Sequence, residues 1–193
     1  LAAARNDVPG IERALLDEGG WVDEEKMGDG NSALIVAASL GHVEAVEFLI
    51  REGANVEHAG RSGATALMVA SAFGHTRVVE ALLDMGGAMV NAPHPFAGNT
   101  ALHFAAEMGR EETIEVLCSH GASGEAKKKT GGTPLHTAAD CNQTSAVRIL
   151  LSSCGCKTTS LLNGDTAPLY LAAQRGFSGV ISALAEAGAD LDF

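Results

Sequence analysis

The stretch GGTPLHTAA, at residues 131–139, carries the pattern that decides the fold. A threonine placed just before a helix can accept a hydrogen bond from an amide that has no partner inside the helix. Proline is tolerated at the next position, because its missing donor would be unpaired there in any case. Leu135 and the alanine pair 138–139 then fall on one helical face. The stretch therefore predicts a turn followed at once by a short helix.

The same pattern recurs along the chain at nearly constant spacing. Its anchoring leucines are Leu34, Leu67, Leu102, Leu135 and Leu169, separated by 33, 35, 33 and 34 residues. A second pattern follows each first one and reads, for example, AVEFLIREGA from Ala45 and VVEALLDMGG from Val78. Leu15 and Leu16 before Gly19 match this second pattern, which indicates a sixth copy at the N-terminus. A fixed period of this length is typical of repeat architectures.

These blocks resemble ankyrin repeats over essentially all 193 residues, and GGTPLHTAA is close to the family's signature. The resemblance implies an all-α fold, an ankyrin-repeat solenoid of stacked helix-turn-helix units with protruding β-turn fingers. We predict one domain over 1–193 that belongs to a longer protein. Its repeats, of which the first is truncated, lie at about 1–29, 30–62, 63–97, 98–131, 132–163 and 164–193.

The copies differ from one another at a few informative positions. Proline occupies its usual place only at Pro134, and the last repeat carries an extra residue at Ala167-Pro168. Asn142 stands where a glycine before the second helix is expected. The hydroxyl residues predicted to cap the first helices are Ser32, Thr65, Thr100, Thr133 and Thr166.

The composition restricts the classes of partner. Formal net charge is −11, which disfavours nucleic-acid binding because nucleic-acid binders usually present a basic patch. Residues 1–63 hold 5 Lys/Arg against 12 Asp/Glu, a net charge of −7. An acidic end would attract a basic partner, but acidity also simply keeps a protein soluble. Both interpretations remain open from the sequence.

No apolar run approaches the ~20 residues needed to span a bilayer, so direct membrane insertion is not expected. No signal peptide is visible, and we interpret the four cysteines as incidental and not as a disulfide framework. A reducing compartment is then expected, namely the cytoplasm, with the nucleus as the other option.

The resemblance implies that partners bind on the concave side, formed by the first helices and the fingers. Leu40, Phe73 and Met108 occupy equivalent positions after the alanine pairs, so they could form an apolar stripe. Equally, they could half-bury against the next repeat. Polar neighbours and finger residues complete the predicted partner-binding set, which is Glu107, Arg175, His58, Arg61, His94, Phe96, Lys127 and Lys128. For the finger residues there are competing interpretations. The segment with His94 and Phe96 could be an insertion without a role, and Lys127 and Lys128 could belong to a charge run that is simply solvated.

The sequence gives no support to catalysis or to a cofactor. The seven histidines and four cysteines do not supply converging zinc ligands, and the glycines lack a phosphate-loop ending. No Ser/His/Asp set is brought together by the repeat. We therefore expect a monomeric, non-catalytic scaffold that binds a protein or peptide and no small-molecule substrate. The alternative is a substrate-recruiting or regulatory domain of a larger enzyme, ubiquitin ligase or channel.

Overall fold

The computed structural model describes residues 2–17, 30–162, 164 and 166–191, and these residues hold eleven α-helices. The chain divides into two compact units, residues 1–89 (unit 1) and 90–193 (unit 2). Apart from the isolated bridges Ala59–Thr65 and Leu162–Thr166, β structure does not occur in the part that the structure describes. The prediction of an all-α fold is therefore confirmed.

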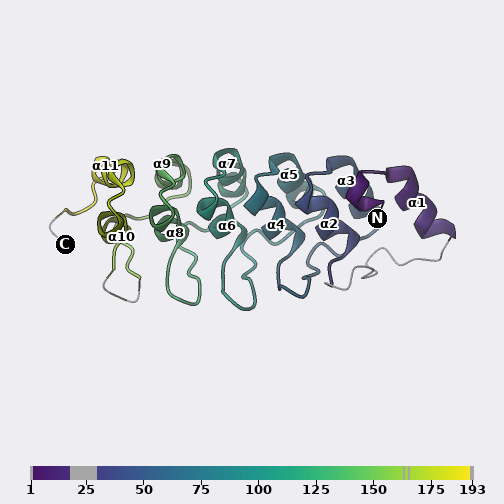
Figure 1. Cartoon of the computed structure of the whole chain (residues 1–193), viewed down its shortest axis with the longest axis horizontal. Helices are drawn as coiled ribbons and strands as arrows, with labels where there is room; N and C mark the ends of the chain where they lie inside the picture. The colour runs from purple at the N-terminus through teal and green to yellow at the C-terminus, as the bar shows by residue number, and fades with distance from the viewer. Residues whose placement is uncertain (1, 18–29, 163, 165, 192–193) are drawn as a thin grey trace. The chain divides into compact units, whose positions relative to one another are not determined.

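Unit 1 alternates first and second helices of successive repeats. A short 3-10 helix, η1 (Ala3–Arg5), precedes α1 (Val8–Asp17), and two helix pairs follow. They are α2 (Ala33–Ser39) with α3 (Val43–Arg51), and α4 (Ala66–Phe73) with α5 (Thr76–Asp84). The first helices α2 and α4 pack side by side, as do the second helices α3 and α5 (Figure 1).

Unit 2 continues the alternation with three helix pairs. They are α6 (Ala101–Glu107) with α7 (Glu111–Ser119), α8 (Pro134–Asp140) with α9 (Thr144–Ser153), and α10 (Pro168–Arg175) with α11 (Ser178–Glu186). Here α8 packs between α6 and α10, and α9 between α7 and α11. Loops extend from the first-helix row in Figure 1. We call them finger A (90–100), finger B (120–133) and finger C (154–162, 164 and 166–167).

The predicted caps explain where most first helices begin. Ser32 accepts from the amide of Ile35, and Thr65 from that of Met68, each at 3.4 Å. Thr100 and Thr133 take part in reciprocal capping boxes with the histidines three residues later.

The predicted cap at Thr166 is wrong, because α10 begins one residue later, with Ala167 as its N-cap and Pro168 in its first turn. The extra residue of this repeat moves Thr166 back into the finger. There its amide and carbonyl pair with Leu162.

The core consists of the repeated leucines and alanines. Each anchoring leucine is at most 8% exposed, and the alanine pairs 37–38, 105–106 and 138–139 are completely buried. Small alanine side chains let neighbouring helices approach closely. Within the part that the structure describes, no helix is long and apolar enough to cross a membrane.

The residue before each second helix ties neighbouring repeats together in three places. The Nε2 atoms of His42 and His75 bond the carbonyls of Ala4 and Ser39, at 3.3 and 3.1 Å. Gln143 Nε2 likewise donates to the carbonyl of Glu107 at 3.0 Å. Each such side chain therefore binds a backbone carbonyl of the preceding repeat.

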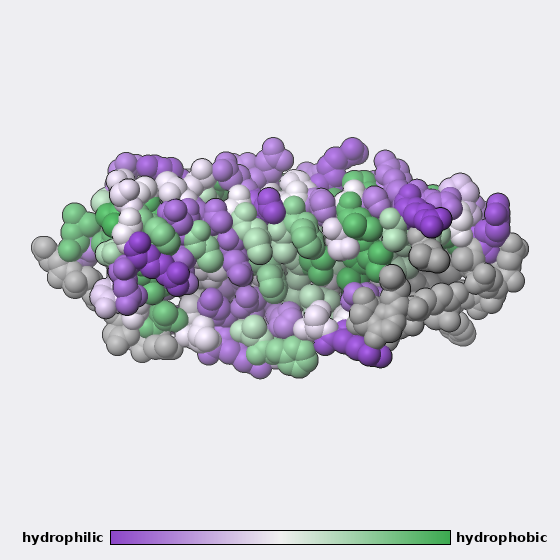
Figure 2. Space-filling view, viewed as in Figure 1, coloured by the Kyte–Doolittle hydropathy of each residue, from purple (hydrophilic) through white to green (hydrophobic). Residues whose placement is uncertain are grey.

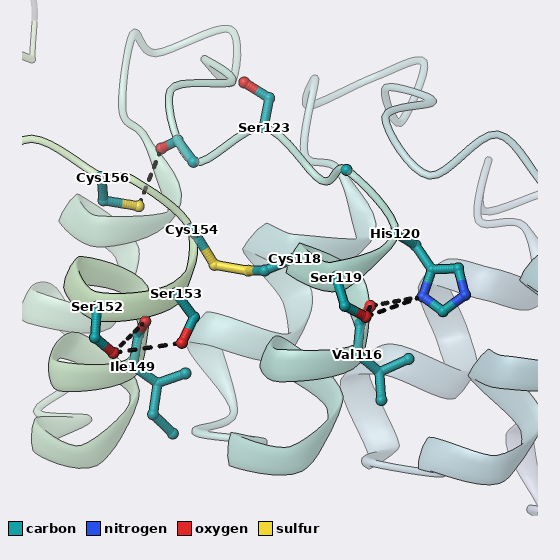
Figure 3. The surroundings of a disulfide bond; sticks show 12 residues. Val116, Cys118, Ser119, His120, Ser123, Ile149, Ser152, Ser153, Cys154 and Cys156 are labelled. Atoms are coloured by element: carbon teal, nitrogen blue, oxygen red, sulfur yellow. Dashed lines mark hydrogen bonds between the residues drawn. A yellow bond between two sulfur atoms is a disulfide. The ribbon is translucent and has the colours of Figure 1, made fainter.

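A disulfide links two repeats of unit 2. It joins Cys118, near the end of α7, to Cys154, which caps α9, and their Cα atoms lie 5.2 Å apart (Figure 3). The interpretation of all four cysteines as incidental is therefore wrong for this pair, because the stacking of α7 on α9 brings together residues 36 positions apart. Cys156 remains a buried free thiol, and its burial raises the pKa to about 12.

Candidate partner-binding surfaces

Two large apolar side chains lie at the same end of neighbouring helices in unit 1. Leu40 caps the C-terminus of α2 and is 49% exposed, while Phe73 is the last residue of α4 and is 56% exposed. Their helical neighbours Leu34 and Leu67 are almost completely buried. The repeat therefore uses its leucine and alanine positions for packing and leaves this end of both helices facing solvent.

His75 connects these two residues structurally. Its ring stacks with that of Phe73 at a centroid distance of 6.1 Å, and its Nε2 donates to the carbonyl of Ser39, next to Leu40. Gly41 fits beneath it only because it lacks a side chain, since a Cβ there would lie 2.7 Å from His75 Nδ1. The surface formed by Leu40, Phe73 and His75, which we call the helix-end surface, is therefore held by specific contacts.

The equivalent positions of unit 2 differ in chemistry. Met108 caps α6 and is 49% exposed, and Glu107 beside it is half-buried. Arg175 forms an ion pair with Asp140 at 2.8 Å, between α10 and α8. The predicted stripe of Leu40, Phe73 and Met108 is thus divided between the two units, and as one surface it stays a prediction.

The two candidates in the finger of unit 1 differ in exposure. His58 is half-buried and its Nε2 donates to the carbonyl of Gly30 at 3.1 Å, so this ring ties its finger to the backbone just before α2. Arg61 is exposed in the turn enclosed by the Ala59–Thr65 bridge. Of the two, Arg61 presents more of its side chain to a partner.

His94 organises the tip of finger A. Its Nδ1 accepts hydrogen bonds from the amides of Phe96 and Ala97, both at 3.3 Å. Its ring makes edge contacts with Phe96 and Phe104, at centroid distances of 5.7 and 6.0 Å. Phe96 itself is 67% exposed. Figure 2 shows apolar surface (green) at the tip of this finger.

The basic residues of finger B fall into two kinds. Lys127 is exposed and Lys128 is half-buried, and neither ammonium pairs with a carboxylate of the described residues. Lys129, which sequence reasoning left out of the candidate set, reaches across to finger A and donates its Nζ to the carbonyl of Pro95 at 2.7 Å. No sequence signal distinguishes these three consecutive lysines, because only the path of the neighbouring finger decides which one is used.

Two buried histidines fix the bases of the fingers. His103 Nδ1 accepts the amide of Thr100 at 3.1 Å, so its proton resides on Nε2, which donates to the carbonyl of Gly132 at 3.1 Å. His136 makes the same pair of contacts with Thr133 and Thr166. Burial lowers the pKa of His103 to about 4 and lowers that of His136 as well. Both rings are therefore neutral structural links.

Sequence reasoning missed one further exposed aromatic side chain. Tyr170 in the first turn of α10 is 54% exposed, although it stands at the position that buried His103 and His136 occupy in their own repeats. Alignment of the repeats could have identified it, because a tyrosine stands there where the two preceding repeats have the histidine that fixes the finger. No set of three or more histidine, cysteine or acidic side chains in the described part of the chain is arranged to hold a metal ion.

Comparison with known proteins agrees with the repeat architecture. The family model for ankyrin repeats (3 copies) matches residues 1–94, 53–128, 85–162 and 123–193. The crystal structure of the human ASB11 ankyrin repeat domain superimposes with a TM-score of 0.86 at 28% identity. That match covers 100% of this chain and 84% of the other.

Two Drosophila melanogaster proteins are similar over 105 residues, or 54% of this chain. The Neurogenic locus Notch protein is 33% identical, and the Ankyrin repeat and KH domain-containing protein mask is 35% identical. The aligned segment spans only 4% and 3% of those proteins. The family model accounts for the whole chain and the solved structure for its fold, and this protein belongs to the ankyrin-repeat family.

Proposed function

We propose that this chain is a monomeric, non-catalytic scaffold that binds a partner protein through the helix-end surface of unit 1. Ankyrin-repeat domains generally mediate protein–protein interactions and generally lack catalysis. The observation that carries the proposal is the half-exposure of Leu40 and Phe73 beside an almost fully buried core. Large apolar anchors on a rigid frame are typical of interface hot spots.

The geometry of unit 1 favours a preorganised surface. His75 holds the Phe73 ring through stacking and holds the end of α2 through its bond to Ser39. A side chain that is already positioned loses less conformational entropy when a partner binds, so more of the contact energy appears as affinity.

The charge of unit 1 favours a basic partner segment. Residues 1–63 carry a net charge of −7, and within this range Glu44, Glu52 and Glu57 belong to the described residues. Residues 18–29, which hold several of the acidic side chains, lie outside the described residues. Electrostatic attraction of this kind would mainly raise the association rate and would weaken as salt rises.

The proposal is tested with the paired variants Leu40→Ala and Phe73→Ala. Partners are captured with the wild-type chain, purified, and titrated against each variant by calorimetry. We expect at least a tenfold loss of affinity for Phe73→Ala, with thermal unfolding nearly unchanged. Met85→Ala is the matched control, because Met85 is 44% exposed and follows a second helix of the same unit. A lower melting temperature with unchanged affinity would show that the two residues serve packing instead.

A second context is a recruiting or regulatory part of a larger enzyme, ubiquitin ligase or channel. The matched segment spans only 3–4% of the Drosophila relatives, which favours a role as one module among others. In that case the captured partner is modified or gated by a neighbouring domain. Adding the purified partner to the full-length protein and assaying its modification or transport would separate this role from simple scaffolding.

A further inference from the structure

Fingers A, B and C of unit 2 carry a charge opposite to that of the whole chain. Their lysines are Lys127, Lys128, Lys129 and Lys157, and among the described finger residues Glu125 is the one acidic side chain; Asp165 lies outside them. Of the other acidic residues of unit 2, three lie on α7 and one on α11, whereas Glu107 and Asp140 end the first helices α6 and α8. Fingers B and C therefore form a basic strip on an acidic protein, while finger A holds no lysine, arginine or acidic residue.

Glu125 keeps its negative charge, but its carboxylate is held by neutral donors and forms no ion pair with the lysines of the described fingers. Its Oε1 accepts the backbone amide of Lys157 at 2.9 Å, and its Oε2 accepts the hydroxyl of Ser160. The ammonium groups of Lys127 and Lys157 form no ion pair with the described residues. Positive charge thus remains available to a ligand.

Fingers A and B are joined along their length. The side chain of Asn91 bonds the backbone of Gly121 and Ser123, at 3.0 and 2.8 Å. Nearer the tip, Lys129 donates its amide to Ala97 at 2.8 Å and its ammonium to Pro95. The two loops therefore present one continuous surface.

The aromatic side chain of Phe96 is exposed to solvent on this surface. The amide of Phe96 is bound by His94 Nδ1, and the ring of His94 lies against both Phe96 and the half-buried Phe104. Phe96 is the most exposed of the large apolar side chains that the structure describes. Maintaining this exposure in a loop fixed by several hydrogen bonds is typical of a binding anchor. In Figure 2 hydrophilic surface (purple) adjoins the green tip of finger A.

We propose that the joined tips of fingers A and B bind an acidic peptide segment of a partner protein that carries a large apolar side chain. Phe96 would cover the apolar side chain, and Lys127 and Lys128 would pair with flanking carboxylates. Because charge at the interface rim chiefly provides attraction and orientation, Phe96 would supply most of the affinity. This inference rests on the proposed function and adds a second surface, whose partner chemistry is opposite to that of unit 1.

The test begins with a selection of random twelve-residue peptides displayed on phage, using the intact 193-residue chain. We expect enriched peptides to contain an excess of Asp and Glu together with at least one Phe, Trp or Leu. Synthetic versions are then titrated by fluorescence anisotropy. We expect Phe96→Ala to weaken binding at least tenfold, and an increase of NaCl from about 50 to about 500 mM to weaken wild-type binding on the order of tenfold.

Charge-reversal variants show which finger contacts the peptide. Lys127→Glu and Lys157→Glu change the net charge equally, but Lys127 lies in finger B, which is bonded to finger A beside Phe96, whereas Lys157 lies in finger C. We expect a three- to tenfold loss from Lys127→Glu and less than a twofold loss from Lys157→Glu. Circular dichroism of each variant checks that folding is intact. Equal losses would overturn the proposal, since they would show only general attraction to a basic strip.

Other outcomes also decide the matter. Enrichment of basic peptides, no enrichment, or binding unaffected by Phe96→Ala would overturn the proposal. A single-stranded RNA twenty-mer that binds more tightly than the peptides, and is released by the same variants, would identify a nucleic acid as the ligand and overturn it as well. If the partner titrations of the proposed function respond to Phe73→Ala and the finger variants have no effect on peptide binding, only the finger proposal fails.

Discussion

The imidazole of His103 donates its Nε2 proton to the carbonyl oxygen of Gly132 at 3.1 Å, and this bond connects the start of α6 to the base of the next finger. The same ring accepts the amide of Thr100 through Nδ1. One buried side chain therefore caps the N-terminus of a helix and fixes the neighbouring repeat. In unit 1 the corresponding positions hold Ile35 and Met68, which cannot form such a link.

Unit 2 is expected to lose stability in mild acid. The pKa of His103 is lowered to about 4 in the folded chain, below its ordinary value of 6.5, so below pH 6.5 the unfolded state takes up a proton that the folded state does not. The His103 contribution is complete above pH 6.5 and is lost as the pH falls toward 4, at about 1.4 kcal/mol per pH unit.

The measurement is the urea midpoint of unfolding at pH 7 and pH 5, a range in which most carboxylates stay ionised. His103→Met is the matched variant, because Met68 fills this position in unit 1. We expect the variant to be less stable at pH 7 and to show a shallower pH dependence. Parallel pH profiles for the two proteins would contradict the assignment.

Oxidation state should change the stability of unit 2. Cys118 and Cys154 close a loop of 36 residues, and a cross-link of that size stabilises a chain by about 3–4 kcal/mol in the chain-entropy model. We expect dithiothreitol to lower the denaturation midpoint of the wild type and to leave Cys118→Ser/Cys154→Ser unchanged. We propose a cytoplasmic or nuclear location, where alkylation of freshly lysed cells should find this pair reduced. A reductant effect of equal size in the double variant would argue against the bond.

Two glycines with the same backbone angle should tolerate alanine differently. Gly41 and Gly176 both have φ of +73°, so alanine costs each about 1–2 kcal/mol of left-handed strain. At Gly41 the new methyl group would also meet the His75 ring, whereas nothing lies within 4 Å at Gly176. We expect Gly41→Ala to be the more destabilising by thermal unfolding and also to weaken binding at the helix-end surface. Equal melting temperatures would show that the His75 ring moves aside freely.

Alanine substitutions at a core position and at a surface position of the same repeat should differ clearly in their effect on stability. Leu102 is completely buried, so Leu102→Ala should lower the free energy of unfolding by about 2–5 kcal/mol through lost burial and a cavity. Met108 is 49% exposed six residues later, and Met108→Ala should change stability by about 0.5 kcal/mol or less. Chemical denaturation of both variants measures the difference. A large loss from Met108→Ala would place this side chain in the packing between repeats.

The sequence by itself determined the repeat, the helix order and most helix starts, because each copy repeats the same local rules. Thr65, Thr100 and Thr133 cap their helices where the pattern predicted, and Asn142 takes the left-handed conformation of the glycine it replaces, with φ of 59°. Local chemistry suffices for such features, since a cap or a turn depends on only a few neighbouring residues.

Only the tertiary structure decided which residues from different repeats meet. The disulfide of Cys118 with Cys154, the reach of Lys129 to Pro95, and the place of Thr166 in the finger instead of at the helix cap all depend on how one repeat lies against the next. The first two contacts join residues about one repeat apart in the chain, and the position of Thr166 depends on the one extra residue of the last repeat. The period predicts that neighbours stack, but the contacts follow from distances of a few ångströms, which a repeating pattern does not encode.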